Sequence, residues 1–166
     1  MIQCPLMQRK NYQKKRDVKD ASRLRVGIVV SRFNSDITDN LLAGAEETLA
    51  EWRVPEKNIT VLRVPGSFEI PYACLSLARK PRGQKPDAII ALGCIIKGET
   101  EHDRYIANAT ASGIMRVSLA HRVPISFGVI TTNNLRQAKA RATGQANKGA
   151  EAAQAALELA FLNRAA

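Results

Sequence analysis

Apolar positions along the chain fall into two alternating patterns. Short runs rich in β-branched residues occur at residues 25–31, 59–64, 88–94 and 124–130. Most of these runs are apolar without strict alternation, as expected for parallel strands that are covered on both faces. Between and after them, apolar residues recur at helical spacing. The pattern predicts helices over about 36–52, from just after Ser67 to Arg79, and over 102–121, 135–142 and 148–163.

The helical pattern is clearest in two segments. Asp36 is a candidate N-cap for a helix that ends before Pro55, with an apolar stripe formed by Ile37, Leu41, Ala45, Leu49 and Trp52. Residues 102–121 carry a second stripe, formed by Ile106, Ala109, Gly113 and Val117. The alternation predicts an α/β fold, a three-layer α/β/α sandwich around a four-stranded parallel sheet. The order of the strands does not follow from these patterns.

Composition and charge then divide the chain into two parts. Its 166 residues, 45% of them hydrophobic, suit one folded domain and exclude collagen-like, low-complexity and wholly disordered chains. The formal net charge is +10, and residues 1–23 hold seven basic side chains against two acidic ones. Half of the net charge therefore lies in this segment. We predict a disordered basic tail over 1–23, able to bind polyanions without specificity, and one domain over 24–166.

Other features narrow the class of protein. No run approaches the roughly 18 apolar residues of a membrane-spanning helix, and the N-terminus lacks the apolar segment of a secretory signal. Cys4, Cys74 and Cys94 are odd in number and far apart, so we expect neither a disulfide framework nor a zinc site. These observations predict a cytoplasmic protein without membrane association or a bound metal.

Polar and aromatic residues follow all four predicted strands, at 31–34, 65–69, 93–102 and 131–134. Ligands of open α/β sheets bind outside the carboxyl ends of the strands, so this convergence predicts a small-molecule site. Phe33 and Phe68 could stack on a planar heterocycle, or they could plug the ends of the sheet. Glu69 could accept hydrogen bonds from ring N–H groups, or favour a helix N-terminus electrostatically.

Several side chains suit a phosphorylated substrate. Residues 97–100 offer a cation, a hydroxyl and backbone N–H groups ahead of a helix, without forming a Walker or dinucleotide motif. His102 is a candidate proton-transfer group, or an ordinary residue of the first helical turn. Arg141 and Lys148 flank a break between two helices, where they could bind phosphate or remain solvated. Cys94 could act as a nucleophile together with His102. The simpler hypothesis is that Cys94 is a small residue that lines the end of its strand.

Taken together, these loops resemble a known family. The segments at 31–34, 64–71, 93–102, 127–132 and 147–153 are similar, in order and spacing, to those of the 6,7-dimethyl-8-ribityllumazine synthase family, and the likeness covers about residues 24–164. The resemblance implies a flavodoxin-like sandwich and homopentamers with active sites between neighbouring subunits. Decamers and 60-subunit icosahedral shells are compatible with it, as is association with riboflavin synthase.

The family catalyses the penultimate step of riboflavin biosynthesis without a cofactor or metal. It condenses 5-amino-6-(D-ribitylamino)uracil with 3,4-dihydroxy-2-butanone 4-phosphate. The resemblance implies that His102 transfers protons. The implied contacts to the ribitylaminouracil are Phe33, Ser67, Phe68, Glu69, Cys94, Ile95 and Ile96, with Phe127 coming from the adjacent subunit. The implied contacts to the butanone phosphate are Glu99, Thr100, Arg141 and Lys148.

Some positions depart from the family's pattern. Glu99 stands where a small residue is common, and Asp103 follows His102 where an aromatic residue is common. The stretch 141–148 looks one residue shorter than in many relatives. The alternative to an enzyme is a non-catalytic, shell-forming homologue that binds lumazine, riboflavin or polyanions.

Overall fold

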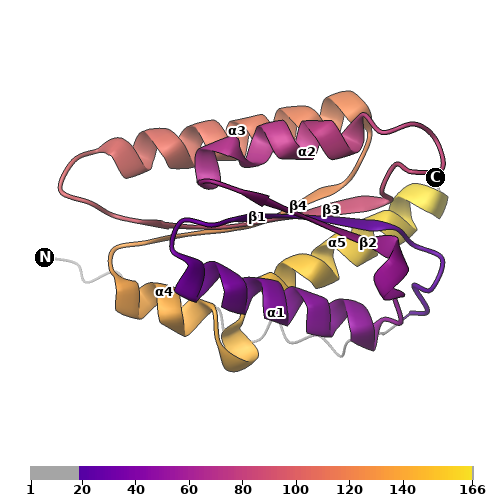
Figure 1. Ribbon diagram of the computed structural model, residues 1–166, viewed down its shortest axis with the longest axis horizontal. Helices are drawn as coiled ribbons and strands as arrows, with labels where there is room; N and C mark the ends of the chain where they lie inside the picture. The colour runs from indigo at the N-terminus through magenta and orange to yellow at the C-terminus, as the bar shows by residue number, and fades with distance from the viewer. Residues whose placement is uncertain (1–18, 166) are drawn as a thin grey trace, which may run out of the picture.

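The computed structural model describes residues 19–165, which form three layers around one sheet (Figure 1). Four strands make up this sheet, and all of their pairings are parallel: β1 (Val26–Ser31), β2 (Ile59–Val64), β3 (Ala88–Ile96) and β4 (Ile125–Thr132). Their order is β2-β1-β3-β4, so β2 and β4 are the edge strands. The predicted α/β class and the four-stranded parallel sheet are confirmed.

Helices cover both faces of the sheet. They are α1 (Ser35–Glu51), α2 (Ile70–Ala78), α3 (His102–His121), α4 (Leu135–Arg141) and α5 (Lys148–Ala165). The helices α1, α4 and α5 lie on one face, and α2 and α3 lie on the other (Figure 1). Short 3-10 turns complete the connections at η1 (Glu56–Asn58), η2 (Ser67–Glu69) and η3 (Gly144–Ala146).

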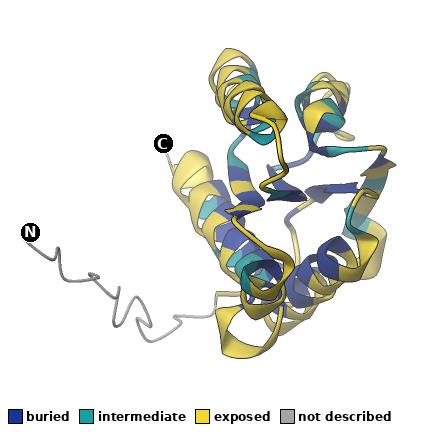
Figure 2. Ribbon diagram, turned by 90° about the vertical axis from the view of Figure 1, so that its left-hand side faces the viewer, coloured by how far each residue is buried: buried dark blue, intermediate teal, exposed yellow. Residues whose placement is uncertain are grey.

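The central strands are buried on both faces, which explains why their sequences are apolar without alternation. In β1, Ile28 and Val30 pack in the layer of α1 and α5, whereas Val29 packs in the layer of α2 and α3. In β3, Leu92 and Ala91 divide between the two layers in the same way. Figure 2 shows the buried residues gathered on the sheet and on the inward sides of the helices.

The predicted apolar stripe of α1 is confirmed, because all five of its residues are buried. The expected N-cap is wrong. Asn34 precedes the helix in the left-handed conformation with φ of 59°, and Asp36 lies in the first turn. The side chain of Asn34 is already engaged, since its Nδ2 donates to the carbonyl oxygen of Cys94 at 3.1 Å.

The predicted stripe of α3 is only partly correct. Thr110 and Ile114 are the buried residues of this helix, whereas Ala109 is exposed. The helix packs against α2 at Gly113, where an added Cβ would come within 2.8 Å of the Pro71 ring. This close approach turns the buried side of α3 toward Thr110 and away from Ala109.

Trp52, the only tryptophan of the chain, follows the C-terminal end of α1. Its buried ring lies 6.2 Å from the ring of Phe161, and its Nε1 has no hydrogen-bond partner among residues 19–165. Lys19 places its Nζ 5.6 Å from the centre of the Phe161 ring, and Ala21 is buried in the same apolar cluster. Packing therefore begins ahead of residue 24. Residues 1–18 of the tail predicted over 1–23 lie outside the described residues, and the structure describes the tail only from residue 19.

Candidate active site

The loops that follow the strands lie together at one end of the molecule, at the left of Figure 1. All of them leave the carboxyl ends of strands, because the four strands are parallel. Two short hydrogen bonds join the first two loops: Arg32 N donates to Val64 O at 2.8 Å, and Phe33 N donates to Pro65 O at 3.0 Å. This backbone pairing extends the β1–β2 ladder beyond the sheet and fixes the loop that carries Phe33.

Phe33 and Phe68 do not plug the end of the sheet. Their exposed fractions are 69% and 60%, so most of each ring faces solvent. An exposed aromatic ring on a hydrogen-bonded loop offers a flat surface to a planar ligand. The exposure of both rings argues against the plug, and the stacking role stays a prediction.

Ser67 and Glu69 are held in η2 by local hydrogen bonds. Glu69 Oε2 accepts from Gly66 N at 2.8 Å, and Ser67 O accepts from Thr110 Oγ1 of α3 at 3.0 Å. Ser67 is buried over Gly93 of β3, where an added Cβ would lie 2.7 Å from Ser67 Oγ. One carboxylate oxygen of Glu69 therefore stabilises the turn that presents Phe68.

The third loop carries His102 at the first residue of α3. Its backbone N lies 3.4 Å from Thr100 Oγ1, and its side chain is exposed. Glu99 is exposed as well, while Glu101 forms an ion pair with Arg104 at 2.8 Å. The imidazole is thus open to solvent at the same end of the sheet as Phe33 and Phe68.

Cys94 is buried at the end of β3, and burial raises the pKa of its thiol to about 11. At neutral pH such a thiol is almost wholly protonated, which argues against a nucleophilic role. Its side chain packs in the layer of α1 and α5, whereas Ile95 packs in the layer of α2 and α3. Ile96 ends the strand and is half-buried. These residues line the strand end, as the simpler interpretation predicted.

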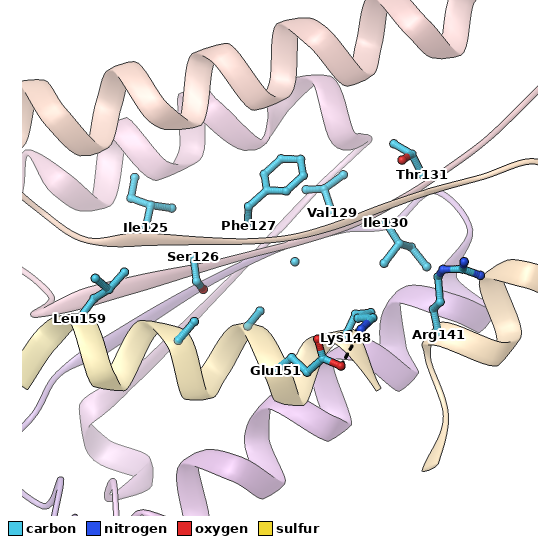
Figure 3. Close-up of a pocket in the computed structure, with 13 residues that line it drawn as sticks. Ile125, Ser126, Phe127, Val129, Ile130, Thr131, Arg141, Lys148, Glu151 and Leu159 are labelled. Atoms are coloured by element: carbon cyan, nitrogen blue, oxygen red, sulfur yellow. Dashed lines mark hydrogen bonds and ion pairs between the residues drawn. The ribbon is translucent and has the colours of Figure 1, made fainter. Parts of the chain in front are cut away.

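A cavity of about 510 Å³ lies along the edge strand β4 and the start of α5 (Figure 3). Phe127, Arg141 and Lys148 line it, and so does Glu151. Phe127 is 48% exposed, and its ring lies on the opposite side of β4 from Arg141, Lys148 and Glu151 (Figure 3). The sequence prediction missed Glu151, although its spacing of three residues from Lys148 on a helix is a signal for an ion pair.

The two cations of this cavity have different partners. Lys148 Nζ lies 2.6 and 2.8 Å from the two carboxylate oxygens of Glu151. Arg141 donates from one guanidinium nitrogen to Gln137 O at 3.0 Å, and no carboxylate of residues 19–165 pairs with it. Arg141 also lines a second cavity of about 500 Å³, together with Lys97 and Asp103. An incoming anion would therefore meet an uncompensated charge at Arg141.

The predicted site residues thus form two groups on one copy of the chain. Phe127, Arg141 and Lys148 share the cavity beside β4. Ser67, Phe68 and Glu69 lie on η2, Phe33 on the neighbouring loop, and none of these four lines that cavity. Glu99, Thr100 and His102 lie on the loop between β3 and α3.

Within residues 19–165, no three His, Cys, Asp or Glu side chains gather where they could hold a metal ion. No helix in the described part of the chain has both the length and the apolar content to cross a membrane.

A known protein family matches most of the chain. The sequence model described as 6,7-dimethyl-8-ribityllumazine synthase matches residues 23–164. The matched range includes every residue of the two groups, and also Glu99, Thr100 and His102 between β3 and the first turn of α3.

Proposed function

The chain belongs to the 6,7-dimethyl-8-ribityllumazine synthase family, and we propose that it condenses 5-amino-6-(D-ribitylamino)uracil with 3,4-dihydroxy-2-butanone 4-phosphate. The observation that carries the proposal is the cavity beside β4, in which Arg141 and Lys148 lie on the α4 and α5 side of the strand (Figure 3). Two cations in one cavity suit a site for the phosphate group of a phosphorylated ketone.

The proposed reaction needs proton transfers and no redox step. The primary amine of the uracil attacks the ketone, and an imine forms with loss of water. Phosphate is eliminated from the four-carbon unit, and ring closure by the ribityl-bearing nitrogen releases a second water. His102 is exposed at this end of the sheet, where its imidazole can exchange protons with the amine and the leaving hydroxyl. Neither a metal nor an organic cofactor enters these steps.

We propose that the two groups of residues meet across an interface between copies of the chain. One copy would supply the Phe33, Phe68 and Glu69 side, and its neighbour would supply Phe127, Arg141 and Lys148 from β4, α4 and α5. The support is that β4 is an edge strand, paired with β3 on one side only, and that the cavity along it is lined by the second group and not by the first. A homopentamer is the assembly that the family resemblance favours. Pentamers could associate further into decamers or 60-subunit shells, and they could bind riboflavin synthase. We place the protein in the cytoplasm.

The experiment is to mix the purified protein with both substrates and to follow lumazine absorbance together with phosphate release. Both products should appear in equal amounts and in proportion to the protein concentration. Arg141→Ala serves as the matched variant and should require more butanone phosphate for half-maximal rate. Binding of lumazine or riboflavin without turnover would reject the enzyme and leave the non-catalytic homologue.

A further inference from the structure

The break between α4 and α5 is closed by one buried amide, that of Asn147. Its Nδ2 donates to Asn40 O at 2.9 Å and to Ala142 O at 3.0 Å. Its Oδ1 accepts from Gly149 N at 2.8 Å and from Ala150 N at 3.3 Å. Both N–H groups and the carbonyl oxygen of the side chain are therefore in use, on a residue that is only 8% exposed.

These four bonds join three helices. The acceptors are the carbonyl oxygen of Asn40 in α1 and that of Ala142 just after α4, and the donors are the first free N–H groups of α5. Orphan N–H groups at a helix start need such an acceptor, and Asn is among the residues that supply it best. Here the same side chain also ties the new helix to the end of the previous one.

The surroundings leave no freedom for this amide to move. A Cβ added to Gly44 of α1 would collide with all three terminal atoms of the Asn147 side chain. A Cβ added to Gly149 would collide with the backbone of Leu41. Glycine at both positions lets α1 and α5 approach closely enough to enclose the amide.

The enclosed amide joins the two chain segments that carry the cations of the cavity beside β4. Arg141 directly precedes Ala142, whose carbonyl accepts one bond, and Lys148 directly follows Asn147. Both cations line the same cavity. We propose that Asn147 is a positioning residue that sets the distance between Arg141 and Lys148, and with it the affinity of the cavity for a phosphate group. The proposal rests on the proposed function only in taking the phosphate to be that of the substrate.

The chemistry of the position is selective for Asn. Asp at 147 would replace the two-hydrogen donor with an oxygen facing the carbonyl oxygens of Asn40 and Ala142. The expected result is repulsion that separates the end of α4 from the start of α5. Gly44→Ala reaches the same amide from α1 by steric contact, without changing any hydrogen-bonding group of the side chain.

The test compares Asn147→Asp and Gly44→Ala with the unchanged full-length protein. The first measurement is the dissociation constant of inorganic phosphate by titration calorimetry, without either substrate. The second is the pair of KM values for butanone phosphate and for the uracil. We expect the dissociation constant and the KM for butanone phosphate to rise about tenfold, since misplacement of a binding group by about 1 Å has effects of this order or larger. The KM for the uracil should change less than about twofold.

Thr48→Val is the matched control, because it removes a buried hydrogen bond to Gly44 O at 3.0 Å one turn further along α1. It should lower stability and leave phosphate binding unchanged, which separates general destabilisation from positioning. Asn147→Ser, a milder change, replaces Asn147→Asp if the latter does not fold.

Three outcomes would overturn the proposal. Asn147→Asp and Gly44→Ala could bind phosphate as tightly as the unchanged protein, Thr48→Val could lose as much phosphate affinity as they do, or the unchanged protein could fail to bind phosphate. Failure of the proposed function would look different. The protein would then show no turnover, while the comparison of phosphate affinities would still decide the role of Asn147.

Discussion

Arg141 and Lys148 face the same cavity, but their charges are satisfied to different degrees. Lys148 is held by both oxygens of Glu151, whereas Arg141 makes one hydrogen bond to a backbone carbonyl. A phosphate that approaches Lys148 must share the ammonium with a carboxylate, while the guanidinium offers several unused N–H donors in a planar fork. Two residues that look alike in the sequence are therefore unequal as phosphate ligands.

We expect Arg141→Ala to raise the KM for butanone phosphate by about tenfold or more, which is the size of a lost charge-assisted hydrogen bond. Lys148→Ala should have a smaller effect, and Glu151→Gln should lower this KM by releasing the ammonium of Lys148. Steady-state kinetics with the uracil at saturation makes the comparison. Equal effects of the two alanine variants would contradict the ranking.

His102 is exposed at the start of α3, and its substitution should affect the rate more than binding. His102→Ala should lower kcat by at most about a hundredfold, at the low end of general acid–base effects, because holding two substrates together supplies much of the acceleration. The pH profile of kcat is the measurement. A correctly assembled variant without any turnover would show that the imidazole is indispensable.

The thiols of Cys74 and Cys94 should be unreactive in the folded protein. Burial raises the pKa of Cys74 to about 12 and that of Cys94 to about 11, so at pH 8 the thiolate fraction of Cys94 is about one in a thousand. In a Cys4→Ser background, a chromogenic disulfide reagent should detect no thiol until the protein is unfolded. The labelling rate should rise with pH, and fast labelling of the native protein at pH 8 would refute the burial argument. Cys94→Ala should retain turnover.

At the scale of elements, the sequence predicted which segments are strands and helices, and where most of them begin. Apolar runs and caps are local signals, so β2, α3 and α5 start where the patterns place them or within a residue. The N-cap of α1 was wrongly predicted because a neighbouring residue takes that position. Asn34 precedes the helix and donates its amide to Cys94 O, and Asp36 therefore lies in the first turn. The strand order was not predictable, because parallel strands buried on both faces have the same pattern in any order.

The contact between α1 and α5 depends on the absence of a side chain at Gly149. Gly149→Ala should lower the free energy of unfolding by about 1–3 kcal/mol, because the new Cβ meets the Leu41 backbone, which must shift. Urea unfolding followed by far-ultraviolet circular dichroism measures this loss. Gly98→Ala is the matched control, since nothing lies within 4 Å of its added Cβ. A similar stability for both variants would show that α5 adjusts without cost.

At the scale of the whole molecule, the end of the sheet at which the candidate residues lie was predictable, whereas their division into two groups was not. The parallel arrangement brings the strand ends together, so loop residues such as Phe33 and His102 were expected at one end of the sheet, and their roles stay predictions. That Phe33 and Arg141 fall in separate groups depends on β4 being an edge strand, which only the sheet order shows. Glu151 was missed because it belongs to no motif: its role is to pair with the ammonium of Lys148.

If neighbouring copies share each site, two variants that are impaired at low butanone phosphate concentration should restore one another. Phe33→Ala and Arg141→Ala impair opposite halves of the proposed site. Co-assembled in equal amounts in a ring, they should leave both halves intact in about a quarter of the sites. The mixed assemblies, obtained by joint refolding, should show activity near this fraction. Activity no greater than that of the separate variants would place both halves on one chain.

Trp52 is the single indole of the molecule, and its fluorescence can be excited selectively over that of the three tyrosines. It lies beyond the C-terminal end of α1, beside Phe161 and at the opposite end from the strand-end loops. An indole in such dry, apolar surroundings emits at short wavelength, and its emission shifts to the red when α1 and α5 separate. Because the ring is remote from Phe33, Phe127 and Arg141, ligand binding at that end should leave its spectrum unchanged. The same fluorescence signal can therefore report the integrity of the α1–α5 layer while substrates are present.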